Sequence, residues 1–204
     1  MFEKTSLGDF ASILALTVIL GGCGAPSPSP PSSYYILSPL SDMKAEAPPS
    51  SAEKKITLAV GPVVIPKHLD RSQIVKRTSR HQLVLASLDQ WAEPLKDNFT
   101  RVLVENLSSL LGTDRVETYP WHRSITVDYQ VVVEVIRFDA NSMGKSILIA
   151  RWKVFGNNGR EFLFSRRSEF SKQVTEKDLE SVVETMSGNL GELSNEIAAA
   201  LIVL

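Results

Sequence analysis

The sequence predicts an α+β fold in which a mostly antiparallel sheet packs against two main amphipathic helices, at about residues 94–111 and 176–201. Two observations predict it. In both helical segments apolar residues recur at spacings of three and four, which is the period of one helix face. Elsewhere, short β-branched and aromatic runs alternate apolar and polar residues, which is the period of a strand. Runs of strands interrupted by two helices are typical of an α+β domain.

The strands expected before the first helix are short. Residues 56–65 alternate apolar side chains and are interrupted by Gly61-Pro62. Because proline has no N–H to donate to a strand partner, we expect a bulge or an edge position there. Residues 73–77 and 82–87 predict two further strands, joined as a hairpin through a turn at Ser79-Arg80-His81.

The first helix is expected to begin at Pro94 and to end before Gly112. A proline suits the first helical turn, where its missing N–H loses no hydrogen bond. A glycine suits the left-handed residue that commonly closes a helix. The predicted buried face is formed by Leu95, Phe99, Val102, Leu103, Leu107, Leu110 and Leu111.

Three strands are expected after this helix. The first is long and carries one apolar face, formed by Ile125, Val127, Tyr129, Val131, Val133 and Val135. The second buries Leu148, Ala150, Trp152 and Val154, and the third is marked by Phe162, Phe164 and Phe170. Gly156-Asn157-Asn158-Gly159 predicts a hairpin turn between the last two, because Gly and Asn tolerate positive φ.

The last helix is expected over residues 176–201, with Thr175 as its cap and Asp178 at the reciprocal position. Gly188 and Gly191 weaken its middle by about 1 kcal/mol each relative to alanine. Its predicted apolar face is formed by Leu179, Val182, Val183, Met186, Leu190, Leu193, Ile197 and Leu201.

The N-terminus predicts a lipoprotein signal. Residues 10–20 are mostly apolar, and Gly21-Gly22 lead into Cys23, the single cysteine, which matches the lipobox pattern. We therefore expect a signal peptide at residues 1–22, cleavage between Gly22 and Cys23, and lipidation of Cys23. A transmembrane helix is the first alternative, but it needs about 20 apolar residues. A buried core helix is the second, but the terminal position followed by Pro and Ser favours a processed segment.

Residues 23–55 are expected to form a lipidated, Pro/Ser-rich tether with a short strand at 34–37, followed by a single α+β domain over 56–204. The run from Ala25 to Ser33 favours extended polyproline II geometry, which makes a semi-rigid spacer. Residues 38–55 predict a poorly ordered loop. Gly24 stands where an Asp commonly retains lipoproteins in the inner membrane, so we expect the outer membrane, with an inner-membrane lipoprotein as the alternative.

The composition and motifs argue against several function classes. The net charge is −1, so no excess of positive charge is present to neutralise nucleic-acid phosphates. His68, His81 and His122 lack metal-ligand spacing, and no Walker loop, dinucleotide fingerprint or serine-nucleophile motif occurs. We therefore expect no catalytic residues, no metal, no cofactor beyond the covalent lipid, and a protein that is not an enzyme.

Two features leave alternatives open. The aromatic residues Tyr34, Tyr35 and Trp91 are candidate partner-binding anchors, although packing within the fold is the simpler interpretation of each. For the tyrosine pair, strand alternation predicts one ring inside and one outside. The locally basic run from Lys67 to His81 either binds an anionic partner such as lipid headgroups or protects a pair of edge strands.

Several of these segments together resemble the ABC-type transport auxiliary lipoproteins, and most closely the paraquat-inducible protein C (PqiC) group. They are Cys23, Tyr34-Tyr35-Ile36-Leu37, Val60-Gly61-Pro62-Val63, Ile65-Pro66, Leu69-Asp70-Arg71 and Trp91-Ala92-Glu93-Pro94-Leu95. The resemblance implies a non-enzymatic subunit of a lipid transport system built around mammalian-cell-entry (MCE) domain proteins. It further implies anchoring at the outer membrane and assembly as a ring of subunits.

Two other functions compete with this one. The first is a stand-alone lipoprotein that carries a lipid or small molecule, which requires a large apolar pocket. The second is a periplasmic enzyme, which requires a cleft with convergent titratable residues.

Overall fold

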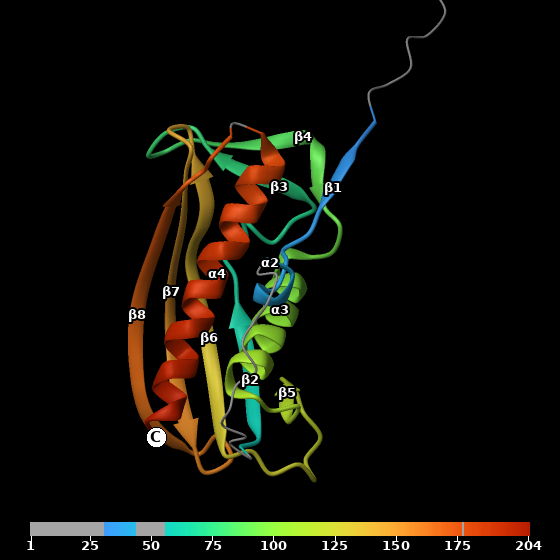
Figure 1. Cartoon of the computed structure of the whole chain (residues 1–204). Helices are drawn as coiled ribbons and strands as arrows, with labels where there is room; N and C mark the ends of the chain where they lie inside the picture. The colour runs from blue at the N-terminus through green and yellow to red at the C-terminus, as the bar shows by residue number, and fades with distance from the viewer. Residues whose placement is uncertain (1–30, 44–55, 177) are drawn as a thin grey trace, which may run out of the picture. The chain divides into compact units, whose positions relative to one another are not determined.

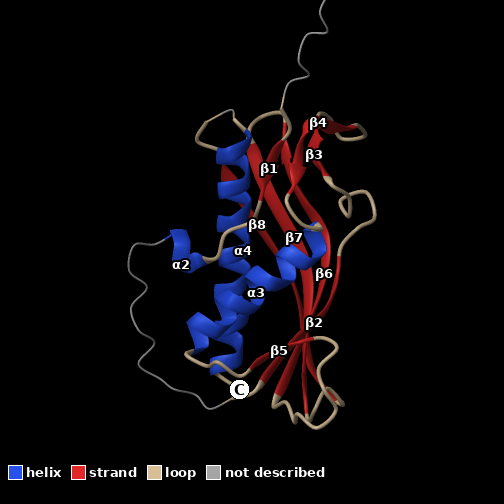
Figure 2. Ribbon diagram, turned by 90° about the vertical axis from the view of Figure 1, so that its right-hand side faces the viewer, coloured by secondary structure: helices blue, strands red, loops and turns tan. Residues whose placement is uncertain are grey.

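Eight strands in the described part of the chain form one sheet, and helices α3 and α4 pack against one of its faces (Figures 1 and 2). The structure is a computed structural model that describes residues 31–43, 56–176 and 178–204. The expected signal peptide, Cys23 and most of the expected loop lie outside the described residues. The elements are β1 (Ser33–Tyr35), α2 (Leu40–Met43), β2 (Leu58–Val64), β3 (Gln73–Arg77), β4 (Leu83–Trp91), α3 (Leu95–Leu111), β5 (Val116–Thr118), β6 (Tyr129–Asn141), β7 (Lys145–Gly156), β8 (Glu161–Gln173) and α4 (Leu179–Ile202).

Strand β6 organises the sheet. On one side it pairs antiparallel with β7, and β7 pairs antiparallel with β8, both over most of their lengths. On its other side, β6 pairs with β2 along its first half and with β3 at its end, both in parallel. Strand β4 is antiparallel to β3, while β1 and β5 add short parallel pairings to β4 and β2. The α+β prediction is confirmed, and the sheet is mixed with its long pairings antiparallel.

The predicted apolar face of the long strand is confirmed from Tyr129 to Val135, whereas Ile125 and Val127 lie in the loop before β6. Val131, Val133 and Val135 are buried, as expected. The register with β7 then shifts between Val135 and Arg137, so Phe138 and Ala140 point inward instead. An extra residue in a strand reverses the inward and outward alternation, which a strict period of two cannot anticipate.

The interruption at Gly61-Pro62 is a bulge, because the register of β2 on β6 shifts between Val60 and Val63. It is not an edge, since β2 lies between β6 and β5. Gly61 has a φ of +113°, and a Cβ built there would lie 2.9 Å from Tyr119 Cβ. Glycine is therefore needed at this position both for its backbone angle and for the close approach of the chain that follows β5.

Helix α3 begins one residue after the expected start, with Pro94 as the residue that precedes it, and Gly112 closes it in the left-handed conformation. Its buried face packs on the sheet, and the ring of Phe99 meets that of Phe138 edge-on with centroids 5.5 Å apart. On the neighbouring strand β7, Trp152 is fully buried, and its indole Nε1 donates to Ser168 Oγ of β8 over 3.0 Å. The core therefore lies between the two helices and the inner face of the sheet, chiefly β2, β6 and β7.

The expected cap of the last helix is wrong. Asp178 caps α4, with its side chain accepting from the backbone N–H of Ser181, and Thr175 does not. The backbone N–H of Val174 still donates to Gly144 O over 2.7 Å, in the turn between β6 and β7. Because the chain stays bound to that turn, the helix starts three residues later than the apolar period suggests.

The folded unit begins at Ser32 rather than near Ile56. The expected strand at 34–37 is β1, and the expected loop opens with the short helix α2. Strand β1 pairs with β4, and α2 lies against α3 and α4.

Candidate tether-docking site

Residues 32–43, here called the N-terminal strap, cross from the edge of the sheet onto the two helices (Figure 2). Strand β1 pairs in parallel with the end of β4, placing Ser33 opposite Asp89 and Tyr35 opposite Trp91. The pairing continues where Ala92 N donates to Tyr35 O over 2.8 Å. The strap is therefore joined to the domain by main-chain bonds at its start.

Polar side chains of α3 and α4 hold the rest of the strap. Leu37 N donates to Asn98 Oδ1 over 2.7 Å, and Leu40 N donates to Asn106 Oδ1 over 2.8 Å. Both asparagines are only 1% exposed. Ser187 of α4 accepts a third bond, from Ser38 N over 3.1 Å. Three successive parts of the strap thus have their main-chain donors satisfied by buried side chains.

The asparagine amide groups are themselves fixed from the other side. Asn98 Nδ2 donates to Glu93 Oε1 over 2.8 Å, and Asn106 Nδ2 donates to Ser194 Oγ of α4 over 3.1 Å. Ser194 in turn donates to Leu190 O. A satisfied buried network of this kind favours one arrangement, because displacing the strap leaves several buried polar groups unpaired.

Apolar contacts complete the site. Leu37 is 1% exposed and belongs to the core, so the strap contributes to the core rather than lying on it. A Cβ built on Gly191 would lie 2.6 Å from Leu40 Cδ2. The glycine that lowers the helix propensity of α4 therefore makes room for the strap.

Sequence reasoning did not identify Asn98 and Asn106. The available signal was their spacing, because both fall on the apolar stripe of the predicted helix, beside Phe99 and Leu107. Polar residues on a buried stripe need partners, and a short amide is suited to binding a neighbouring main chain.

The candidate aromatic anchors divide into buried and exposed. Trp91 is 5% exposed and belongs to the core, which supports the packing interpretation. Tyr34 is 65% exposed, whereas Tyr35 is half-buried and its hydroxyl lies 3.4 Å from Asp89 Oδ1. Partial burial, and then the charge of Asp89, raise the pKa of the Tyr35 phenol above its ordinary value. Of the three, Tyr34 alone has a mostly exposed ring, so it stays the candidate partner-binding residue.

The basic run does not lie on two edge strands, since β3 pairs with both β4 and β6. Arg77 and Arg137 each bind a different oxygen of Asp139, over 2.9 and 2.8 Å, and the Asp139 side chain is fully buried. One charge of the run therefore fastens the β3–β4 hairpin to β6. Lys76 and Arg80 remain exposed, without an ion pair to another described residue.

No cluster of three or more potential metal ligands occurs among the described residues. His68, His81 and His122 are all exposed. A groove of about 610 Å³ beside the strap is lined by residues that include Asp42, Glu180 and Glu184. Ligand pockets are concave and mostly apolar, so this carboxylate-bearing groove does not favour a stand-alone lipid carrier.

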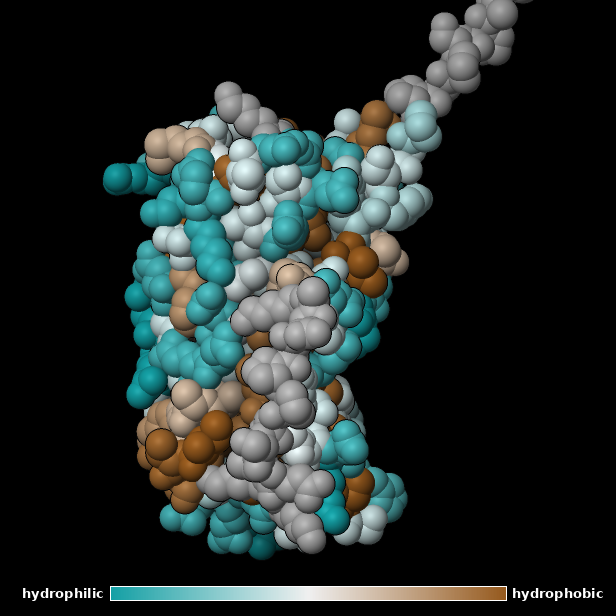
Figure 3. Space-filling view, in the orientation of Figure 1, coloured by the Kyte–Doolittle hydropathy of each residue, from teal (hydrophilic) through white to brown (hydrophobic). Residues whose placement is uncertain are grey.

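Apolar side chains are exposed at one corner of the domain, where α4 ends beside the start of β8 (Figure 3). Phe162 is 57% exposed, Val203 84% and Leu204 48%. No helix in the described part of the chain is long and apolar enough to cross a membrane.

Comparisons with known proteins give one family match and several structures of the same fold. The sequence model of the ABC-type transport auxiliary lipoprotein component matches residues 35–198. A crystal structure of an uncharacterised protein has the same fold, with a TM-score of 0.68 and 22% identity over 84% of this chain and 99% of that one. Protein XCC0632 from Xanthomonas campestris, of the DUF330 family, gives a TM-score of 0.65 and 16% identity over 81% and 92%. No curated protein matches the sequence. Because the family match covers most of the chain, this protein belongs to the ABC-type transport auxiliary lipoprotein family.

Proposed function

We propose that this chain is the outer-membrane-anchored lipoprotein subunit of an MCE-type ABC lipid transport system, with a docking rather than a catalytic role. The family match over residues 35–198 carries the proposal. In this role Cys23 bears the lipid, the Pro/Ser run spaces the domain from the membrane, and an MCE-domain protein in the periplasm is the partner.

The strap supports an anchoring role. A tether that only joins a lipid to a domain needs no fixed attachment, yet here buried Asn98, Asn106 and Ser187 bind the chain that leads from Cys23. Firm attachment fixes where the tether leaves the domain. A subunit that acts by its position needs such a fixed exit, whereas a diffusing carrier does not.

The open edges of the sheet support assembly as a ring. Strand β8 pairs only with β7, and β1 covers β4 only at Asp89–Trp91, so Leu83–Leu88 of β4 form an open edge within the described chain. The prolines just before β1 lack the N–H groups needed to extend that cover. Open edges on opposite sides of one sheet suit head-to-tail contacts between copies, which close into rings.

The exposed corner of Phe162, Val203 and Leu204 supports docking of a protein partner. Exposed apolar patches on soluble domains commonly mark interaction sites. This corner lies at the end of the domain away from β1 (Figure 1), so it faces away from the tether exit. A periplasmic protein is the partner that can reach it.

The test is affinity purification from solubilised membranes of the wild type, Cys23→Ala and Phe162→Ser. We expect an MCE-domain protein to co-purify with the wild type, and Cys23→Ala to leave the membrane fraction. Phe162→Ser should stay in membranes but lose most of the partner. Val64→Ser is the matched control, because Val64 is 53% exposed on β2, away from this corner.

Recovery of the wild type in the soluble fraction would contradict the anchor. Recovery from membranes with no MCE-domain protein bound would contradict the transport role while leaving the anchor intact.

A further inference from the structure

The strap determines the end of the domain from which the tether leaves. Because β1 runs parallel to β4, the start of β1 points the same way as the start of β4 at Leu83. That is the direction of the turn between β3 and β4. Figures 1 and 2 both show β1 entering at the end of the domain that carries this turn, opposite the turn between β7 and β8.

Two turns at this end are braced against each other, and we call Thr78–Gln82 and Asn141–Lys145 the apical turns. Ser142 Oγ donates to Thr78 O over 3.2 Å, which joins them. Asn141 Oδ1 accepts from the N–H groups of Met143 and Lys145, both over 3.0 Å. Gln173 Nε2, at the end of β8, donates to Met143 O over 3.0 Å. The second turn therefore holds its shape through side-chain bonds.

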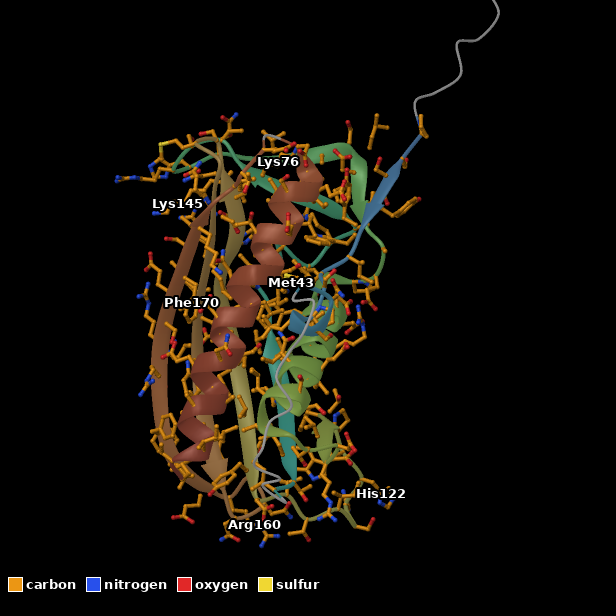
Figure 4. All side chains as sticks on the ribbon, viewed as in Figure 1. Met43, Lys76, His122, Lys145, Arg160 and Phe170 are labelled. Carbon is orange, nitrogen blue, oxygen red and sulfur yellow. The ribbon has the colours of Figure 1, made fainter. Side chains whose placement is uncertain are left out.

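The apical turns present an apolar side chain among cations. Met143 is 77% exposed, although its main chain is bonded on both sides. Arg80 and Lys145 are exposed and make no ion pair with another described residue. Figure 4 shows Lys76 and Lys145 at this end and Arg160 at the other. An exposed apolar tip flanked by cations is suited to the boundary between lipid headgroups and acyl chains.

Acidic residues at the same end would restrict any contact with an anionic surface to the apical turns. Glu176 and Asp178 lie just before α4, and Asp178 is bound to Ser181 as the helix cap. A negatively charged surface repels these carboxylates while it attracts Arg80 and Lys145. The domain is therefore expected to tilt towards its cationic side.

We propose that the apical turns rest on anionic lipid headgroups of the membrane that holds the anchor. Met143 enters the interface, and Arg80 and Lys145 contact phosphates. The inference rests on the proposed function, because it requires the lipid on Cys23, but it adds a second contact between the domain and the membrane. A lipid chain combined with a basic patch makes a stronger and better oriented attachment than either alone.

Chain length restricts the alternatives. The ten residue steps from Cys23 to Ser33 span at most about 35 Å when fully extended. Strand β8, with 13 residues, is about 40 Å long at about 3.3 Å per residue. An inverted domain, standing on the β7–β8 turn, would hold Ser33 farther from the membrane than the tether reaches. Only apical and sideways orientations remain, and the cations favour the apical one.

The test uses the full lipidated chain in phosphatidylethanolamine vesicles containing phosphatidylglycerol. Lipidation blocks the single cysteine, so Met143→Cys or Arg160→Cys introduces one thiol for a fluorescent label. Lipids with a spin label in the headgroup then quench any label near the surface. We expect quenching at least three-fold stronger at position 143 than at 160. Adding Arg80→Glu and Lys145→Glu, or omitting the anionic lipid, should remove most of that difference.

Equal quenching at the two positions, or stronger quenching at 160, on protein that floats with the vesicles overturns the apical contact and leaves the anchor standing. A difference that persists unchanged after both charge reversals and without anionic lipid overturns the recognition of headgroups. Protein that fails to float and carries no acyl mass overturns both this inference and the proposed anchor.

Discussion

At the scale of single residues, a few buried polar groups account for how the strap is held. Asn106 binds the main chain of the strap at Leu40 with one end of its amide and Ser194 of α4 with the other. An amide in this position replaces the water that an unattached tether would keep around its main chain. Asn106 stabilises the fold because its removal would leave the Leu40 N–H and Ser194 Oγ without this partner.

We expect Asn106→Ala to lower the free energy of unfolding by about 1–3 kcal/mol, because it leaves the partly buried N–H of Leu40 without its acceptor. Limited proteolysis should also cut the strap several-fold faster. Urea unfolding and mass spectrometry of the digest measure the two effects. Asn195→Ala, a partly exposed amide on the same helix pair, is the control and should change neither quantity. Proteolysis at the wild-type rate would contradict the role of Asn106.

Asp139 fastens the β3–β4 hairpin to β6, as Asn106 fastens the strap to the helices. Replacing it by Asn leaves Arg77 and Arg137, each about a quarter exposed, without their shared counter-charge. Breaking a buried pair costs about 3–5 kcal/mol, and partial exposure of the arginines reduces this to about 2 kcal/mol. Glu134→Gln, which breaks the exposed pair with Arg151, should cost under about 1 kcal/mol in the same urea experiment. Equal losses of unfolding free energy in the two variants would contradict the role of Asp139 as a buried counter-charge.

At the scale of elements, the two glycines of α4 make a matched pair. A Cβ on Gly188 would meet Lys172 at an ordinary contact distance of 3.6 Å, whereas a Cβ on Gly191 would meet Leu40 at 2.6 Å. We expect Gly188→Ala to raise the free energy of unfolding by about 0.5–1 kcal/mol through helix propensity. Gly191→Ala gains the same helix propensity but displaces Leu40, so its free energy of unfolding should rise less than that of Gly188→Ala. Its strap should also be cut faster by protease. A larger gain at Gly191 would contradict the packing of the strap.

The start of α4 gives a prediction about pH. Hydrogen bonding from the Ser181 backbone lowers the pKa of Asp178 below its ordinary value of 3.8. A carboxyl whose folded pKa is depressed contributes stability that is fully present above its unfolded pKa and is lost as the pH falls through the folded value. Asp178→Asn keeps the cap but removes this contribution, so the variant should lose less stability than the wild type between about pH 5 and pH 2. Identical pH profiles in thermal unfolding would show that the cap does not titrate.

The sequence predicted those elements whose own residues carry a clear local pattern. Helix α3, strand β7 and the Asn157-Asn158 turn need only local patterns, and all three lie where expected. Strands β5 and β1 have three residues each and helix α2 has four, too few to show a periodic pattern. They form because the rest of the fold offers them a partner. The bulge after Val135 and the cap at Asp178 depend on register with neighbouring strands and turns, which one sequence does not display.

At the scale of the whole folded unit, two ends have different chemistry. One carries the tether exit and the apical turns with Met143, and the other carries the larger apolar corner around Phe162, with Arg160 nearby (Figures 3 and 4). A subunit standing between a membrane and a periplasmic partner needs this polarity. The three histidines are exposed, and the described residues form no cluster of three or more potential metal ligands.

Ring assembly is argued from the open edges and is tested on the assembled protein. Native mass spectrometry of detergent-extracted wild type should show one closed oligomer. A proline in place of Leu85, which is 42% exposed on the open part of β4, should shift it towards monomer. Leu85→Ser is the control for lost apolar area alone and should shift it less. A wild type that is monomeric at micromolar concentration would contradict the ring.

The central claim is that this domain acts from a fixed place on a membrane, held there by one modified cysteine. Intact-mass and N-terminal peptide mass spectrometry of protein extracted from native membranes tests it most directly. The account predicts a mature chain that starts at Cys23, carries the mass of a diacylglyceryl group, and lacks residues 1–22. A chain that still begins at Met1, or a Cys23 that carries no acyl mass, would contradict it.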